Sequence, residues 1–139
     1  MKYIKKFENV NKDSSIKSIK LFFDKLSIIV KDYLNIDLIL DLNSINSSGG
    51  GTPVVYFLFK NDISSSIFVS FFILNAGIQI IFNEYASDNG LFDFLFSIIG
   101  EYDEEKESGF MIDYKELDNI SNILVNEFEL WNSCQKYNI

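Results

Sequence analysis

The sequence predicts an α+β domain with a central, mainly antiparallel sheet of four to five strands, an N-terminal helix, a short middle helix and a C-terminal helix. Residues 13–34 repeat apolar side chains at intervals of three and four, which is typical of a helix with one buried face. Segments rich in Val, Ile and Phe then follow over residues 36–85, as strands require. No internal repeat or linker interrupts the 139 residues, so we expect a single domain, 1–139.

The first helix is expected to begin at Asp13 or Ser14, because either side chain can accept hydrogen bonds from the first free backbone N–H groups. Its apolar stripe consists of Ile16, Ile19, Phe23, Leu26 and Val30. The same spacing also occurs in coiled coils, but a Phe at a core position favours packing on a sheet.

Four strands are expected at residues 36–42, 53–60, 66–74 and 78–85. The first alternates apolar and polar side chains, which indicates one partly solvated face. The second and third are apolar on both faces, which predicts central strands with some cover on each side. Short turns at Asn61-Asp62 and at Asn75-Ala76-Gly77 predict an antiparallel meander.

The remaining elements are a short buried helix at 90–100, a fifth strand at 109–114 and a last helix at 116–135. Ser87 and Asp88 are the expected cap residues of the short helix. Five like charges in seven positions repel one another, so residues 101–107 are expected to form a loop or a frayed helix end.

Charge is divided unevenly along the chain. Residues 1–70 carry nine lysines against seven acids, a balance of +2, whereas residues 71–139 carry three lysines against thirteen acids, a balance of −10. The net charge is −8, and the chain contains no His and no Arg. A concentrated negative field attracts basic partners and repels nucleic acid, whose binding requires Lys or Arg clusters.

Residues 63–83 are uncharged over a length that would allow a membrane span. Asn75, Gly77 and Gln79 interrupt this segment near its middle, which favours a β-hairpin instead. The basic N-terminus continues into polar residues and does not resemble a secretory signal, so we expect a cytoplasmic protein without membrane association. The single cysteine, Cys134, suits a reducing compartment and is expected to be a small packing residue on a helix.

Catalysis that depends on a Ser-His-Asp or Cys-His arrangement is excluded by the absence of His. The Gly49–Gly51 run precedes Pro53 and a strand, whereas a phosphate-binding loop leads into a helix. Paired carboxylates remain the one catalytic option, with Glu84, Asp88 and Asp93 as candidates for glycoside hydrolysis. Surface solvation explains these acids more simply, so we expect no enzyme and no cofactor.

Metal binding is also disfavoured. The acids of the segment 101–107 could supply oxygen ligands, but their spacing does not match a calcium-binding loop, in which acids alternate around a glycine. We therefore expect no dedicated metal site.

The composition favours protein recognition, because the chain carries acids interspersed with aromatic side chains, and such side chains can serve as anchors in an interface. The residues predicted to contact a partner are Glu84, Tyr85, Asp88, Asp93, Glu101, Tyr102, Asp103, Glu104, Glu105, Glu107, Asp113, Tyr114 and Glu116.

With its small size, its acid-rich segment Glu101–Ser108 (EYDEEKES), its single cysteine and its lack of catalytic groups, the chain resembles the cytoplasmic immunity proteins of bacterial toxin systems, especially those of contact-dependent growth inhibition. The resemblance implies stoichiometric binding of a cognate basic toxin, an RNase or DNase domain, whose active-site cleft the acidic surface would occlude. The sequence leaves the oligomeric state unknown, although a monomer is favoured.

Two other classes remain open. Secretion chaperones of the type III kind are also small, acidic and α+β, and they dimerise while binding an effector segment; their order of elements is similar in outline to the order expected here. An acidic nucleic-acid mimic would present a regular row of charge over a long face, whereas these acids cluster in one segment and along two helices.

Overall fold

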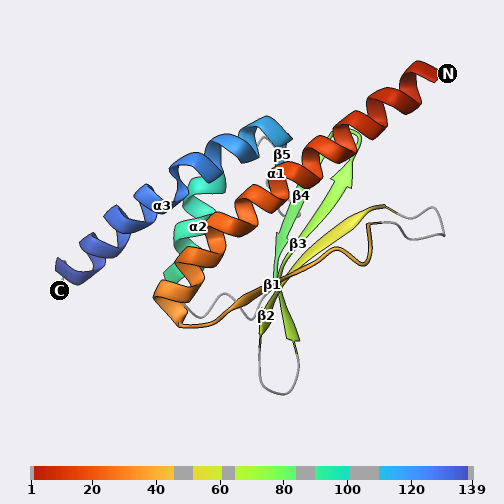
Figure 1. Ribbon diagram of the computed structural model, residues 1–139. Coiled ribbons are helices and arrows are strands. Elements are labelled where there is room, and N and C mark those ends of the chain that lie inside the picture. Colours follow the sequence, from red (N-terminus) through yellow and green to blue (C-terminus); the bar gives the residue numbers. More distant parts are fainter. Residues whose placement is uncertain (1, 46–51, 61–64, 84–89, 101–109, 138–139) are drawn as a thin grey trace.

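The computed structural model describes residues 2–45, 52–60, 65–83, 90–100 and 110–137. It confirms the α+β fold, with a five-stranded antiparallel sheet and three helices (Figure 1). The elements in chain order are α1 Lys2–Leu34, β1 Leu38–Asp41, β2 Val54–Lys60, β3 Ser65–Leu74, β4 Gly77–Phe82, α2 Gly90–Gly100, β5 Phe110–Ile112 and α3 Tyr114–Tyr137.

The sheet is a meander in the order β1-β2-β3-β4-β5, and every neighbouring pair is antiparallel. The chain leaves the sheet after β4 to form α2 and returns to place β5 beside β4, with Ile78 opposite Ile112. The expected hairpin turn at Asn75-Ala76 joins β3 to β4. None of the described helices combines the length and the apolar character that crossing a membrane requires.

Helix α1 begins eleven residues earlier than expected, at Lys2 rather than at Asp13. The predicted caps Asp13 and Ser14 are therefore wrong, because both residues lie inside the helix. A polar cap residue stabilises a helix start but does not impose one, and the Lys-rich segment before Asp13 continues the helix in the same direction. The helix ends at Leu34, and Asn35 adopts a left-handed backbone with φ 56°.

A β-bulge interrupts the pairing of β2 with β3. Phe57 lies opposite Val69 and Leu58 lies opposite Ile67, so Phe68 has no partner residue on β2. Its side chain is buried, and its ring stacks on Phe59 with 4.6 Å between centroids. The bulge thus directs an additional aromatic side chain into the core.

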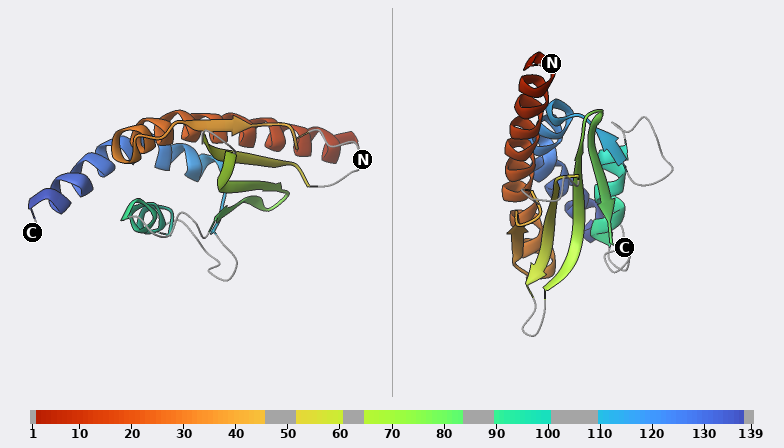
Figure 2. Two further views of the ribbon diagram at one scale, coloured as in Figure 1. Left: turned by 90° about the horizontal axis from the view of Figure 1, so that it is seen from below. Right: turned by 90° about the vertical axis from the view of Figure 1, so that its right-hand side faces the viewer.

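Helices α2 and α3 lie on one side of the sheet, and α1 runs along its β1 edge, with its N-terminal end beyond the strands (Figure 2). On α1, Phe22 contacts Phe57 and Phe71 of the central strands, with ring centroids 6.1 and 5.9 Å apart. On α2, Phe92 contacts Phe82 of β4. Helix α3 runs beside α1 and in the same direction, and the contact between its C-terminal half and α2 includes Phe94 and Phe128 at 5.7 Å. The core is one continuous aromatic and aliphatic cluster between these helices and the sheet.

The opposite side of the sheet is here called the open face. Strand alternation assigns to it Ile39, Asp41, Val54, Tyr56, Leu58, Lys60, Ile67, Ser70, Phe72, Leu74, Gln79, Ile81 and Met111. The sequence correctly predicts that β2 and β3 carry apolar side chains on both faces. Among the described elements, the aromatic contacts between α1 and these strands lie on the side of Phe57 and Phe71, opposite the open face.

Candidate functional site

Four of the thirteen predicted partner-binding residues lie within the described part of the chain: Asp93, Asp113, Tyr114 and Glu116. The other nine lie outside the described residues, namely Glu84, Tyr85, Asp88, Glu101, Tyr102, Asp103, Glu104, Glu105 and Glu107. The Gly49–Gly51 run and the expected cap residues Ser87 and Asp88 also lie outside them.

The structure does not bring the four described residues together. Asp113, Tyr114 and Glu116 lie at the start of α3. Asp93 lies one turn into α2, whose first residue Gly90 contacts the Trp131 indole near the other end of α3. Because a helix rises about 1.5 Å per residue, these two ends of α3 are separated by roughly 25 Å. The described acids are therefore distributed along α3 and α2 and do not gather in one compact site.

Asp113 has a structural role at the first turn of α3. Its Oδ1 atom accepts a hydrogen bond of 2.9 Å from the backbone N–H of Glu116, and its carbonyl oxygen accepts one from the N–H of Leu117. Asp113 is therefore the N-cap of α3. Asp113 and Glu116 also place negative charge at the positive end of the helix dipole, which stabilises both carboxylates there.

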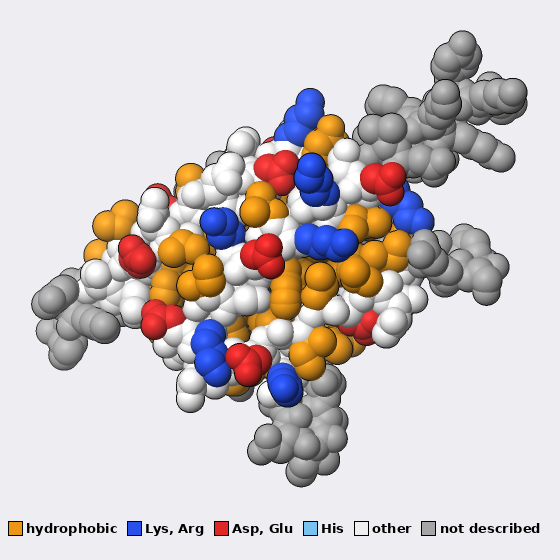
Figure 3. All heavy atoms as spheres, viewed as in Figure 1, with side chains coloured by type: hydrophobic (Ala, Val, Ile, Leu, Met, Phe, Trp, Pro, Cys, Tyr) orange, Lys and Arg blue, Asp and Glu red, His pale blue; other side chains and the backbone are white. Residues whose placement is uncertain are grey.

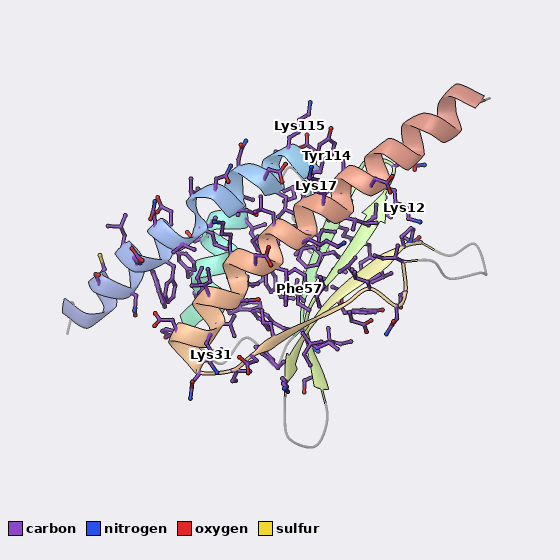
Figure 4. All side chains as sticks on the ribbon, in the orientation of Figure 1. Lys12, Lys17, Lys31, Phe57, Tyr114 and Lys115 are labelled. Carbon is purple, nitrogen blue, oxygen red and sulfur yellow. The ribbon has the colours of Figure 1, made fainter. Side chains whose placement is uncertain are left out.

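Tyr114 lies partly buried against the core and lines a cleft between α1 and α3 (Figure 4). The ammonium group of Lys115 lies 6.0 Å from the centre of its ring. The cleft has a volume of about 500 Å³ and is lined by Ser14, Lys17, Ser18, Leu21, Tyr114, Asp118 and Asn122. Its lining includes Lys17 from the basic half of the chain and one acid of the other half, Asp118.

Sequence reasoning missed every cleft residue except Tyr114. The helical period shows which residues of one helix share a face, but it does not show which helices are neighbours. The available signal is the pair of small side chains Ser18 and Ser121, since both are buried and small residues allow two helices to approach closely.

Six of the thirteen acids of residues 71–139 are described: Asp93, Asp113, Glu116, Asp118, Glu127 and Glu129. Each of them is at least partly solvent-exposed. Within the described part of the chain the one ion pair joins Lys31 to Asp37, so none of these six acids is neutralised by a described lysine. Figure 3 shows that lysines and carboxylates are interspersed where α1 and α3 lie side by side, so this face is mixed in charge.

Several described aromatic residues of the acidic half pack in or against the core. The Trp131 indole packs against Tyr33 and Phe94, with ring centroids 5.6 and 5.4 Å apart. Phe110 packs against Phe96. Cys134 lies on α3 as expected, but its side chain is exposed, so the expectation that it packs against other residues is wrong.

The described residues hold no group of three or more His, Cys, Asp or Glu side chains arranged to bind a metal ion. Comparison with known proteins gives no match to any family model, any curated protein or any solved structure.

Proposed function

We propose that the chain is an immunity protein, which binds a cognate basic nuclease toxin and blocks its active-site cleft. The observation that carries the proposal is the set of unneutralised acids in the C-terminal half. All six that the structure describes reach solvent, and none is paired with a described lysine. Their charge is therefore available to a partner.

Helix α3 contributes most of this charge. It carries Glu116, Asp118, Glu127 and Glu129, and Asp113 caps its first turn. The predicted segment Glu101–Glu107 precedes β5 and α3 in the chain and carries five more acids. A field of this sign accelerates the approach of a protein rich in lysine and arginine, to about 10⁸–10⁹ M⁻¹s⁻¹ at low salt. A nuclease cleft that binds phosphate has that composition, and an acidic protein bound there excludes the substrate.

The direct test is capture of the product of the neighbouring gene at low salt and again in about 0.5 M NaCl, where the Debye length is only a few ångström. The proposal expects a 1:1 complex with one basic protein and loss of that protein's nuclease activity. Failure to capture a basic protein at either salt concentration would contradict it.

Charge reversal identifies which acids dock. Glu127→Lys with Glu129→Lys changes the net charge by four units at exposed positions of α3. Asp24→Lys with Asp32→Lys, at exposed positions of α1, changes it equally and serves as the matched control. We expect the α3 pair to lower the association rate at least tenfold at low salt, with a smaller effect from the α1 pair.

The pair Glu104→Lys and Glu105→Lys tests the acid-rich segment in the same way. We expect it to slow association by at least as much, because five acids lie within seven positions there. Equal rates for all three double variants would mean that only net charge matters and that no acidic surface docks.

The secretion chaperone is the second candidate, because the described elements follow the order helix, strands, helix, strand, helix. This order is similar in outline to that of the chaperones. In a capture experiment, a chaperone would be recovered with an extended effector segment bound to it, and it would not inhibit a nuclease. Mass spectrometry of the captured partner after limited proteolysis separates the two functions.

A further inference from the structure

The open face forms a second apolar surface, separate from the core. Cross-strand pairing arranges its side chains in rows: Ile39, Leu58 and Ile67 form one row, and Val54, Phe72, Gln79 and Met111 form another. Between these rows lie Asp41, Tyr56, Ser70 and Ile81. Aliphatic and aromatic side chains thus predominate on both sides of the sheet.

Solvent reaches this surface. Ile67 and Ile81 are each 37% exposed, although they lie on the central strand and on its neighbour β4. Leu58 and Phe72 are partly exposed and belong neither to the buried core cluster nor to the apolar residues packed against it. Exposed apolar side chains that gather on one surface mark an interaction site.

The charge on the open face distinguishes between occupants. Among its described strand residues are one carboxylate, Asp41, and one ammonium group, Lys60, so their charges balance in a chain with a net charge of −8. A basic partner that is attracted by negative charge gains no electrostatic attraction from this side of the molecule. A neutral apolar sheet face is complementary to another neutral apolar sheet face, and each copy of this chain presents one.

We infer that the open face is the contact surface of a homodimer, in which the sheets of two copies pack face to face. Two sheets pack in this way about 10 Å apart with their strands within about 30° of each other. A two-fold axis places the same residues on both sides of such an interface, so no second complementary surface is needed. The dimer surface is separate from the proposed toxin-binding acids, since the acids of α3 lie outside the open face. A dimer departs from the monomer favoured for an immunity protein and is shared with the secretion chaperones.

The size of the face is compatible with a weak dimer. With strands about 4.8 Å apart and about 3.3 Å per residue, five strands of up to seven paired residues cover roughly 20 Å by 20 Å. Projecting side chains make the accessible area larger than this footprint, so two faces together remove about 1,000 Å² from water, near the lower limit for a stable interface. We therefore expect dissociation in the micromolar range.

The experiment is sedimentation velocity with light scattering of the full chain, at concentrations from about 1 to about 300 µM, which bracket a micromolar dissociation constant. The inference expects conversion from monomer to dimer over this range. Each single substitution, Ile67→Glu or Ile81→Glu, should prevent dimerisation, because the dimer would then bury a carboxylate in an apolar contact. A monomer at every concentration would overturn the inference.

The matched controls are Ile28→Glu on α1 and Leu130→Glu on α3, which place the same substitution at residues 57% and 64% exposed on the helical side. They should dimerise like the unmodified chain, and loss of dimer in all four variants would overturn the inference. Circular dichroism and a denaturant midpoint verify that each variant folds. If Ile67→Glu were to misfold, Ser70→Lys tests the same face at a partly exposed polar position.

Toxin neutralisation, measured separately on the monomeric variants, keeps the two proposals distinguishable. If a variant loses dimerisation but still neutralises the toxin, the result supports both the homodimer and the immunity function. If Ile81→Glu abolished capture of the partner while the unmodified chain remained a monomer, the open face would belong to the partner and the inference of a homodimer would be wrong.

Discussion

The carboxylate of Asp113 accepts a hydrogen bond of 2.9 Å from the backbone N–H of Glu116 and so caps helix α3. Replacement by Ala removes this acceptor, and we expect Asp113→Ala to lower the free energy of unfolding by about 1 kcal/mol. Asp113→Asn should retain most of the stability, because the Asn side chain also caps. Urea unfolding followed by circular dichroism measures the difference, and equal stability of the Ala and Asn variants would contradict the capping role.

Gly77 is the position in the hairpin where only glycine fits. Its φ is 148°, and a Cβ atom there would lie 2.7 Å from the carbonyl oxygen of Ile112. Gly77→Ala therefore strains the backbone and separates β4 from β5, which should lower the free energy of unfolding by about 2 kcal/mol or more.

Gly100→Ala is the matched control for that substitution. A Cβ atom at Gly100 would lie 3.7 Å from the Phe110 ring, an ordinary contact, and its backbone conformation is open to any residue. We expect this variant to be as stable as the unmodified chain or slightly more stable, because alanine favours the helix. Destabilisation of equal size at both glycines would contradict the argument from geometry.

Phe57 lies at the centre of the core. Its ring contacts Phe22 and Phe23 of α1 and Phe71 of β3, with centroids 4.5 to 6.1 Å apart. Phe57→Ala leaves a cavity between α1 and the sheet, and we expect a loss of about 3–5 kcal/mol in the free energy of unfolding. Phe57→Leu should cost less because it fills part of that volume. Thermal unfolding measures both, and a loss below 1 kcal/mol for Ala would contradict this assignment.

The ion pair between Lys31 and Asp37 should contribute little. The two groups lie 3.3 Å apart, but both side chains are more than half exposed. We expect Asp37→Asn to change the free energy of unfolding by less than about 0.5 kcal/mol, because water already solvates both charges. The same unfolding experiment at low and high salt tests this, and a clear salt-dependent loss would contradict it.

The fold could be predicted largely from the sequence because its elements have distinct periods and short connections. The run of β-branched and aromatic residues on either side of Asn75-Ala76-Gly77 identifies a hairpin from local chemistry alone. The start of α1 could not be predicted, because a good cap at Asp13 does not exclude a longer helix. The bulge at Phe68 depends on the register between two strands, and neither strand specifies that register by itself.

The candidate site was less predictable for a physical reason. Charge is a property of composition, so the acidic half is evident from the sequence, but the cap role of Asp113 depends on where a helix begins. Lys17 and Asp118 line one cleft only because α1 and α3 pack side by side, and their separation of about one hundred positions leaves no local signal. The open face likewise depends on which side of the sheet the helices pack against, and the sequence does not specify that side.

The packing of α1 beside α3 also constrains how the chain acquires its structure during synthesis. The ribosome releases α1 and the first four strands well before α3, yet α1 buries part of its apolar stripe against that last helix. Contacts between such distant segments form slowly, because a long loop must close before they stabilise anything. Until α3 emerges, the nascent chain exposes apolar surface. Chaperones that recognise such surface can bind the chain during this interval.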